Sequence, residues 1–178
     1  MLSREMIKTS PALCVAVVEH TAFIKVPGRA NYASSIDLKS VVGELRQRGF
    51  TEFVLDLREC LTMDSTFLGV LAGLVLRNNQ PEPDPPSIEL LNPNDRVLDL
   101  IENLGVLSMF KVKNEEVPST LRFEPTNDHS EPTKEEVTRN CLEAHRTLMQ
   151  VNPANVPKFK EVTQFMAEDL KKLGNNGN

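Results

Sequence analysis

The sequence is poor in several residue types, and each shortage excludes a class of function. It has no Trp and a single Tyr, Tyr32, which argues against an aromatic ligand-binding box or a surface that stacks RNA bases. Its three cysteines (Cys14, Cys60 and Cys141) are odd in number and widely spaced, which is typical of a reduced cytosolic protein rather than of a disulfide framework. No apolar run approaches the length of a membrane span. We therefore expect a cytoplasmic protein without membrane insertion.

The net charge and the chain length limit the possible partners and the number of domains. The net charge is −5 and no block of basic residues occurs, so nucleic acid is not expected as a partner. The chain has 178 residues, of which 40% are hydrophobic and 25% charged. These values predict one packed domain of ordinary size with an appendage.

Residues typical of enzymes and metal sites are scattered. The three histidines, His20, His129 and His145, do not have metal-ligand spacing, and Ser65 beside Asp64 has no nearby His in the sequence. A Gly-rich phosphate loop of the P-loop type is also missing. We therefore expect no catalytic residue, no cofactor and no metal.

One stretch, residues 53–76, combines a buried strand and a buried helix. Residues 53–57 are an apolar run rich in strand formers, and residues 68–76 are apolar nearly all round, as in a helix packed against a sheet. Between them, Asp64, Ser65 and Thr66 can each cap a helix. A hydroxyl at this place faces free backbone N–H groups, which would favour a phosphate. Spacing alone favours a plain capping role for Ser65 over a phosphorylation site.

The same stretch resembles the signature of STAS domains, which occur in bacterial anti-sigma factor antagonists and in the tails of sulfate transporters. The resemblance rests on Asp64-Ser-Thr-Phe-Leu-Gly69, preceded by the strand Val54-Leu-Asp-Leu57, and extends roughly over residues 13 to 112. Antagonists have Asp-Ser-Ser/Thr-Gly-Leu-Gly here, and a partner kinase phosphorylates the first Ser. The resemblance thus identifies Ser65 as the phosphorylation site and reverses the judgement from spacing.

The resemblance also implies partners and a binding surface. Unmodified, the surface around Ser65 would bind an anti-sigma factor or serine kinase of the GHKL type, and a phosphatase would reset the switch. The expected partner-binding residues are Asp64, Thr66, Phe67 and Asn31. Phe67 replaces the usual Gly and is either an exposed knob or a core residue, and Asn31 replaces the usual Asp.

The predicted fold class is α/β: a STAS-like mixed β-sheet with alternating helices, plus a C-terminal helical extension. We expect a tail at 1–12, the STAS domain at 13–112, a Pro-containing linker at 113–131 and two helices within 132–178. Within the domain, strands are expected at 13–18, 22–26, 53–57, 87–91 and 109–112. Helices are expected at 34–48, with Ser34 as N-cap, at 68–76, and at 93–104, with Pro93 in the first helical position. Residues 78–86 are expected to form an exposed loop.

The C-terminal extension begins with a capping box, Thr133 to Glu136, followed by apolar residues at helical spacing. A second amphipathic helix follows a break at 152–157. Helices of this length are marginal alone, so they must pack on each other, on the sheet domain or on a partner, including a second copy in a homodimer.

Two other functions stay open at this point. In the first, the chain is a STAS scaffold or regulatory subunit of a stressosome-like or transporter complex, the C-terminal helices make the contact, and Ser65 is only a cap. In the second, more remote one, it is a small Ser-dependent hydrolase, which predicts that Ser65→Ala changes the turnover of generic esters.

Overall fold

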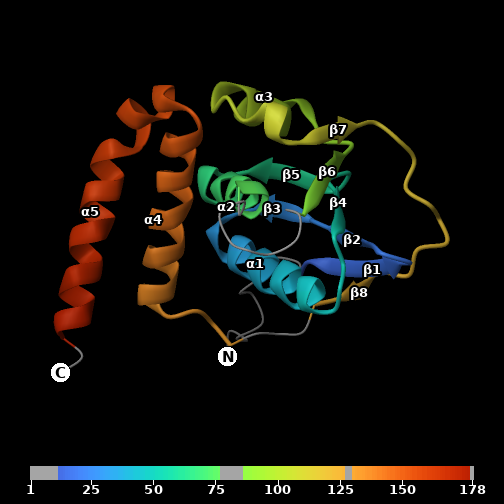
Figure 1. Ribbon diagram of the computed structural model, residues 1–178, viewed down its shortest axis with the longest axis horizontal. Coiled ribbons are helices and arrows are strands. Elements are labelled where there is room, and N and C mark those ends of the chain that lie inside the picture. The colour runs from blue at the N-terminus through green and yellow to red at the C-terminus, as the bar shows by residue number, and fades with distance from the viewer. Residues whose placement is uncertain (1–11, 77–85, 127–129, 177–178) are drawn as a thin grey trace, which may run out of the picture.

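A six-stranded mixed sheet forms the centre of the computed structural model, which describes residues 12–76, 86–126 and 130–176 (Figure 1). The strands lie in the order β7-β6-β4-β2-β1-β8. The pairs β2–β4, β4–β6 and β6–β7 are parallel, whereas β1 runs antiparallel to β2 and to β8. The strand bounds are β1 Cys14–Val18, β2 Thr21–Lys25, β4 Glu52–Asp56, β6 Ser87–Leu91, β7 Lys111–Lys113 and β8 Glu124–Pro125. The predicted mixed sheet is confirmed.

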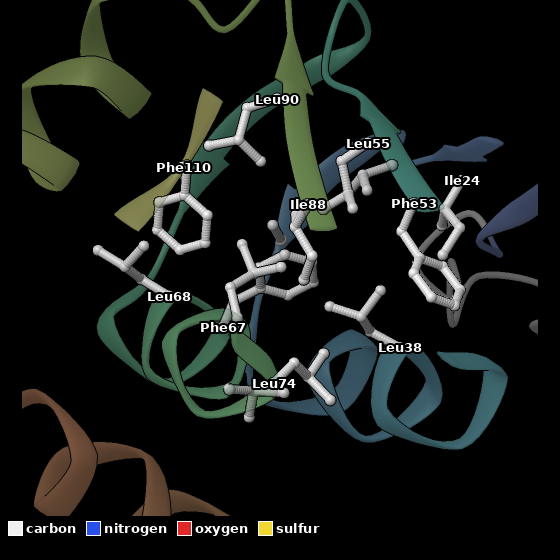
Figure 2. Close-up of a cluster of buried hydrophobic side chains, with 14 of the residues drawn as sticks. Ile24, Leu38, Phe53, Leu55, Phe67, Leu68, Leu74, Ile88, Leu90 and Phe110 are labelled. Carbon is white, nitrogen blue, oxygen red and sulfur yellow. The ribbon is translucent and has the colours of Figure 1, made fainter. Parts of the chain in front are cut away.

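Three helices alternate with these strands and share one core with them. They are α1 Tyr32–Gln47, α2 Ser65–Leu76 and α3 Asp95–Asn103, and a short 3-10 helix, η2 Leu107–Met109, precedes β7. Because successive side chains of a strand point to opposite faces, Phe53 and Leu55 of β4 reach the helices together. Figure 2 shows Phe67, Leu68 and Leu74 of α2 directed into the same cluster. This cluster is the main core of the molecule.

The opposite face of the sheet is covered by the segment that the sequence predicted to be a linker. Val54 and Leu91 pack there against Val117, with Leu121 and Phe123 beside them. Strand β8 then pairs with β1. The prediction of a free linker over residues 113–131 is therefore wrong for residues 114–126, because the few apolar residues among its polar ones are placed to cover the sheet.

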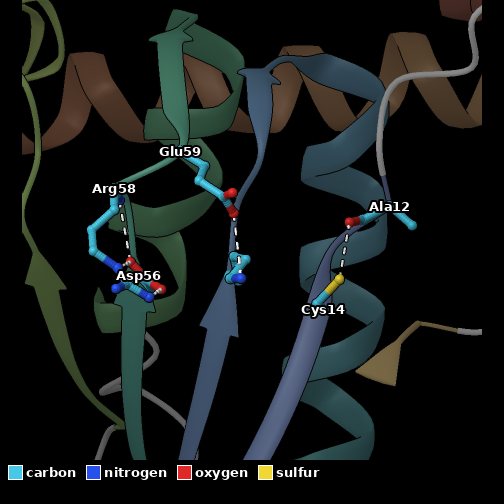
Figure 3. Close-up of polar contacts among 6 residues, drawn as sticks. Ala12, Cys14, Asp56, Arg58 and Glu59 are labelled. Atoms are coloured by element: carbon cyan, nitrogen blue, oxygen red, sulfur yellow. Dashed lines mark hydrogen bonds and ion pairs between the residues drawn. The ribbon is translucent and has the colours of Figure 1, made fainter. Parts of the chain in front are cut away.

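A small second sheet, which the sequence analysis did not predict, leads into α2. It consists of β3 Gly28–Ala30 and β5 Cys60–Met63, which are parallel. The turn before β5 is fixed by the fully buried Asp56, whose carboxylate accepts hydrogen bonds from Arg58 Nε at 2.9 Å and Nη2 at 2.8 Å (Figure 3). Because a buried carboxylate must be paired, this contact fixes the direction in which the chain leaves the sheet.

Two helices begin at other residues than predicted. The N-cap of α1 is Asn31, whose side chain accepts from the backbone N–H groups of Ala33 and Ser34, while Ser34 returns the bond as the third helical residue. The expectation that Ser34 is the N-cap is wrong because Asn31, three residues earlier, is the N-cap and forms a capping box with Ser34. Likewise Asn94 caps α3, so Pro93 lies just before that helix.

The C-terminal extension packs on the sheet domain. It consists of α4 Lys134–Val151, the 3-10 helix η3 Pro153–Asn155 and α5 Val156–Asn175. The predicted capping box between Thr133 and Glu136 is confirmed. Figure 1 shows α4 beside α2, with α5 outside it as an outer layer. No helix in the described part of the chain is long and apolar enough to span a membrane. The predicted tail, apart from Ala12, and most of the predicted loop at 78–86 lie outside the described residues.

Candidate functional site

Asp64, between β5 and α2, joins the beginnings of two helices. Its Oδ1 accepts a hydrogen bond from the backbone N–H of Phe67 at 2.8 Å, and its Oδ2 accepts one from that of Tyr32 at 3.0 Å. Its own N–H donates to the carbonyl of Ala30 at 2.9 Å. Asp64 is therefore the residue that caps α2 and also binds the first turn of α1. The hydroxyl of Ser65 is not needed for capping.

The surroundings of Asp64 shift its titration. Burial raises the pKa of the Asp64 carboxyl above its usual 3.8, against the opposing effect of the N–H groups of Phe67 and Tyr32 and of nearby His145. Desolvation thus outweighs the favourable bonds at two helix N-termini. Keeping Asp64 ionised therefore costs desolvation free energy. The carboxylate lies where it partly offsets the positive potential at the N-termini of both helices.

Ser65 is the first residue of α2 and makes its side-chain contact with the C-terminal extension. Its Oγ lies 2.9 Å from Nε2 of His145 on α4. The His145 side chain is only 6% exposed, and its ring stacks on that of Phe159 on α5, with centroids 4.7 Å apart and planes inclined by 24°. The sequence analysis found no His near Ser65. That expectation is wrong, because the fold brings together two residues that are 80 positions apart.

The protonation of His145 follows from its burial. Desolvation lowers the pKa of the imidazole below its usual 6.5, although Asp64 and the Cys141 carbonyl favour the charged form. The neutral ring can accept a hydrogen bond from the Ser65 hydroxyl through Nε2. Its Nδ1 is buried and has no hydrogen-bond partner in the described part of the chain.

Beyond Ser65, the side of α2 that faces α4 is made of small residues. Thr66 Oγ1 donates to Cys141 Sγ at 3.7 Å, and Cys141 lies one turn of α4 before His145. At Gly69 the two helices lie so close that a Cβ atom would stand 2.4 Å from the carbonyl oxygen of Ala144. Only Gly fits there. The absence of a side chain is what allows α4 to approach the residues at the start of α2.

Two of the other expected partner-binding residues, Phe67 and Thr66, are buried. Phe67 has no exposed surface and belongs to the main core, so the alternative of an exposed knob is wrong in this conformation. Thr66 is 5% exposed and lies under α4. Asn31, the N-cap of α1, is half-buried, as are Asp64 and Ser65, while Tyr32 next to them is exposed.

Sequence reasoning missed His145, Gly69 and Cys141 as members of this site. The helical spacing of Cys141, Ala144 and Leu148 indicated a buried face, and His145 follows Ala144 directly. A polar, titratable residue beside such a face was the available signal. Nothing in the sequence, however, identified the surface against which this face packs. Among the described residues, no group of His, Cys, Asp or Glu could hold a metal ion.

Comparisons with known proteins give likenesses in structure only. The sequence matches no model of a protein family, and no curated protein is similar to it. The structure is similar to that of the anti-sigma factor antagonist SpoIIAA in its unphosphorylated form, with a TM-score of 0.49 and 20% sequence identity, over 58% of this chain and 90% of that one. For the phosphorylated form of SpoIIAA, a Bacillus cell fate determinant, the TM-score is 0.45 and the identity 19%, over 58% and 93% of the two chains.

A candidate anti-sigma factor antagonist from Thermotoga maritima gives a TM-score of 0.48 at 17% identity, over 55% of this chain and 82% of the other. The chain is thus similar to structures of anti-sigma factor antagonists. The α/β fold itself is established by the strand order and helix positions described above.

Proposed function

We propose that this chain is a cytoplasmic, non-catalytic regulatory protein of the anti-sigma factor antagonist kind, in which phosphorylation of Ser65 controls binding of a kinase-type anti-sigma factor. The observation that supports this most directly is the position of Ser65. It is the first residue of α2, Asp64 has already capped that helix, and the Ser65 hydroxyl points to another element instead of its own backbone.

The two helix N-termini beside Ser65 favour an anion there, although the neighbouring Asp64 carboxylate opposes it. Helices α1 and α2 both begin at this point, since the carboxylate of Asp64 accepts from the first turn of each. Helix N-termini favour anions, and a phosphoserine adds about −1.5 to −2 charges at neutral pH. A partner that binds the unmodified surface would meet this new charge at the contact, and repulsion and desolvation would weaken the complex.

The test is an affinity capture from the native cells with wild-type protein and Ser65→Asp as parallel baits. We expect the wild type to retain a kinase-fold partner that Ser65→Asp retains at least about tenfold less, because the added charge is repelled and must be desolvated at the contact. Ser65→Ala is the matched control, because it removes the hydroxyl without adding charge. Equal capture of that partner by Ser65→Asp and the wild type would contradict the proposed switch.

A second candidate function is favoured by the outer face of α5. Phe165 is 69% exposed and Val162 37% exposed on this helix. Such a face would suit a scaffold or regulatory subunit whose C-terminal helices contact the partner. Deletion of residues 132–178 would not test this cleanly, since it would also uncover α2. Phe165→Asp, which changes only the outer face, abolishes capture under the scaffold function and leaves it intact under the proposed switch.

A further inference from the structure

Helix α4 covers the side of α2 on which Ser65 lies. Two side-chain contacts and one close backbone approach define the covered surface: Ser65 with His145, Thr66 with Cys141, and Gly69 with Ala144. Ser65 and Thr66 are the two hydroxyl residues of the stretch 64–69, and Gly69 is its glycine. The surface through which an external partner would contact Ser65 is therefore already covered, and the covering element is α4 of the same chain.

A phosphate on Ser65 does not fit under this cover. The hydroxyl oxygen is 2.9 Å from the imidazole, so the three oxygens of a phosphoryl group would need the space that the ring fills. The ring cannot easily withdraw, because it is 6% exposed and stacked on Phe159. With the Ser65 side chain in this rotamer, phosphorylation therefore requires α4 to move. By thermodynamic linkage, a phosphate already present must weaken the docking of α4 by the same factor.

The contact is built unevenly along α4. Near Ser65 it is polar: Asn140 Nδ2 donates to Ser35 Oγ of α1 at 2.9 Å, and His145 Nδ1 is buried without a partner among the described residues. At the other end, Leu148 is fully buried in the main core, and Asn155 Nδ2 donates to the carbonyl of Leu104 at 2.9 Å. The segment of α4 from Asn140 to His145, which covers Ser65, thus carries polar contacts to α1 and α2 that the end at Leu148 lacks, as expected of an element that opens.

We propose that α4, with α5 stacked on it, is an intramolecular competitor that occupies the partner-binding side of α2, so that its docking excludes both phosphorylation of Ser65 and binding of the external partner. The role of the partner in this inference rests on the proposed function; the exclusion of a charge at Ser65 does not. The docked chain is a closed state, and the affinity for a partner is reduced by the fraction of molecules that are open.

The experiment measures amide hydrogen exchange in the full chain carrying Ser65→Glu, which places a carboxylate where the phosphate would be. We expect exchange in residues 140–145 of α4 to rise roughly tenfold or more, while exchange in β4 and β6 stays at the wild-type rate. Ser65→Ala and Ser119→Glu are the controls. The first removes the bond to His145 without adding bulk or charge, and the second adds the same side chain at an exposed position.

Two results would overturn the inference. If α4 exchanges in Ser65→Glu as slowly as in the wild type, the charge is accommodated under the cover and no competition exists. If β4 and β6 lose protection to the same degree as α4, then α4 does not open separately from the sheet domain. Ala144→Glu, which disturbs the same contact from the α4 side and leaves Ser65 unchanged, must reproduce the selective opening.

The same Ala144→Glu variant distinguishes failure of this inference from failure of the proposed function. As bait in the capture experiment, it should retain several times more kinase-fold partner than the wild type, because its Ser65 surface is open. Selective opening without any increase in capture would leave the cover established and contradict the partner-competition half of the inference. If amide exchange in α4 is unchanged in Ser65→Glu and Ala144→Glu but Ser65→Asp still loses the partner, α4 does not exclude a charge at Ser65. The proposed phosphorylation switch would then remain supported. The exchange measurement itself needs no partner.

Discussion

Helix α2 has two buried sides that are built in opposite ways. Toward the sheet it carries large apolar side chains, among them Phe67, Leu68 and Leu71, which are all fully buried in the main core (Figure 2). Toward α4 it carries the hydroxyls of Ser65 and Thr66 and the bare backbone of Gly69 and Gly73. A large apolar surface gains free energy from burial wherever it is excluded from water, whereas a small polar surface gains little.

This difference indicates which contact is structural and which can be exchanged. The sheet side of α2 cannot be uncovered without breaking the main core. The part of the α4 side around Ser65 and Thr66 is easier to uncover, because its hydroxyls find hydrogen bonds equally well with water. The polar pairs there are specific in geometry, but they contribute little net stability. A surface of this composition suits a contact that alternates between an internal and an external partner.

The largest effect is expected on the sheet side. Phe67→Ala should lower the free energy of unfolding by about 3–5 kcal/mol, because it leaves a cavity in a fully packed core. Urea unfolding followed by circular dichroism measures this loss. Phe165→Ala removes the same atoms at a position that is 69% exposed and should change stability by less than about 0.5 kcal/mol. Equal losses in the two variants would mean that Phe67 does not form the core as described.

A smaller and more local effect is expected on the α4 side. Gly69→Ala places a methyl group 2.4 Å from the Ala144 carbonyl, so α4 must shift, at a cost of about 1–3 kcal/mol. Amide exchange should show the loss in α4 and not in β4. Gly43→Ala in α1 is the matched control, since its added Cβ meets nothing within 4 Å, and a Gly-to-Ala change in an open helical site is stabilising by about 0.5–1 kcal/mol. Loss of protection in β4 in the Gly69→Ala variant would mean that the α4 side of α2 cannot be disturbed independently of its sheet side.

The sequence predicted one side of α2 and not the other, for a physical reason. Strand alternation and the apolar run at 68–76 are local patterns, and they are sufficient to predict the sheet, the helix and Ser65 at its beginning. The partner of a small, polar helix face leaves no such pattern. That the cover is α4, with His145 opposite Ser65, depends on a packing between segments 80 residues apart. The packed segment at 114–126 escaped prediction for the same reason.

The smallest effect is expected from pH. Burial lowers the pKa of His145 below 6.5 in the docked state, so at pH values between the two pKa values the undocked chain binds more protons. Docking of α4 should therefore weaken as the pH falls from 7.5 to 5.5. The groups that face the imidazole are Ser65 and Asp64 from the sheet domain and the ring of Phe159 from α5.

Asp64 acts in the opposite direction. Because its pKa is raised above 3.8, protonation of this carboxyl on acidification stabilises the folded chain, and that contribution is lost as the pH rises through its folded pKa. The two contributions are separated by comparing urea unfolding at pH 7.5 and 5.5 in the wild type and in His145→Gln, which keeps a polar side chain that does not titrate. The wild type should lose more stability on acidification than the variant. The same loss in both would mean that the imidazole is not held neutral against Ser65, and that the polar side of α2 does not exclude charge.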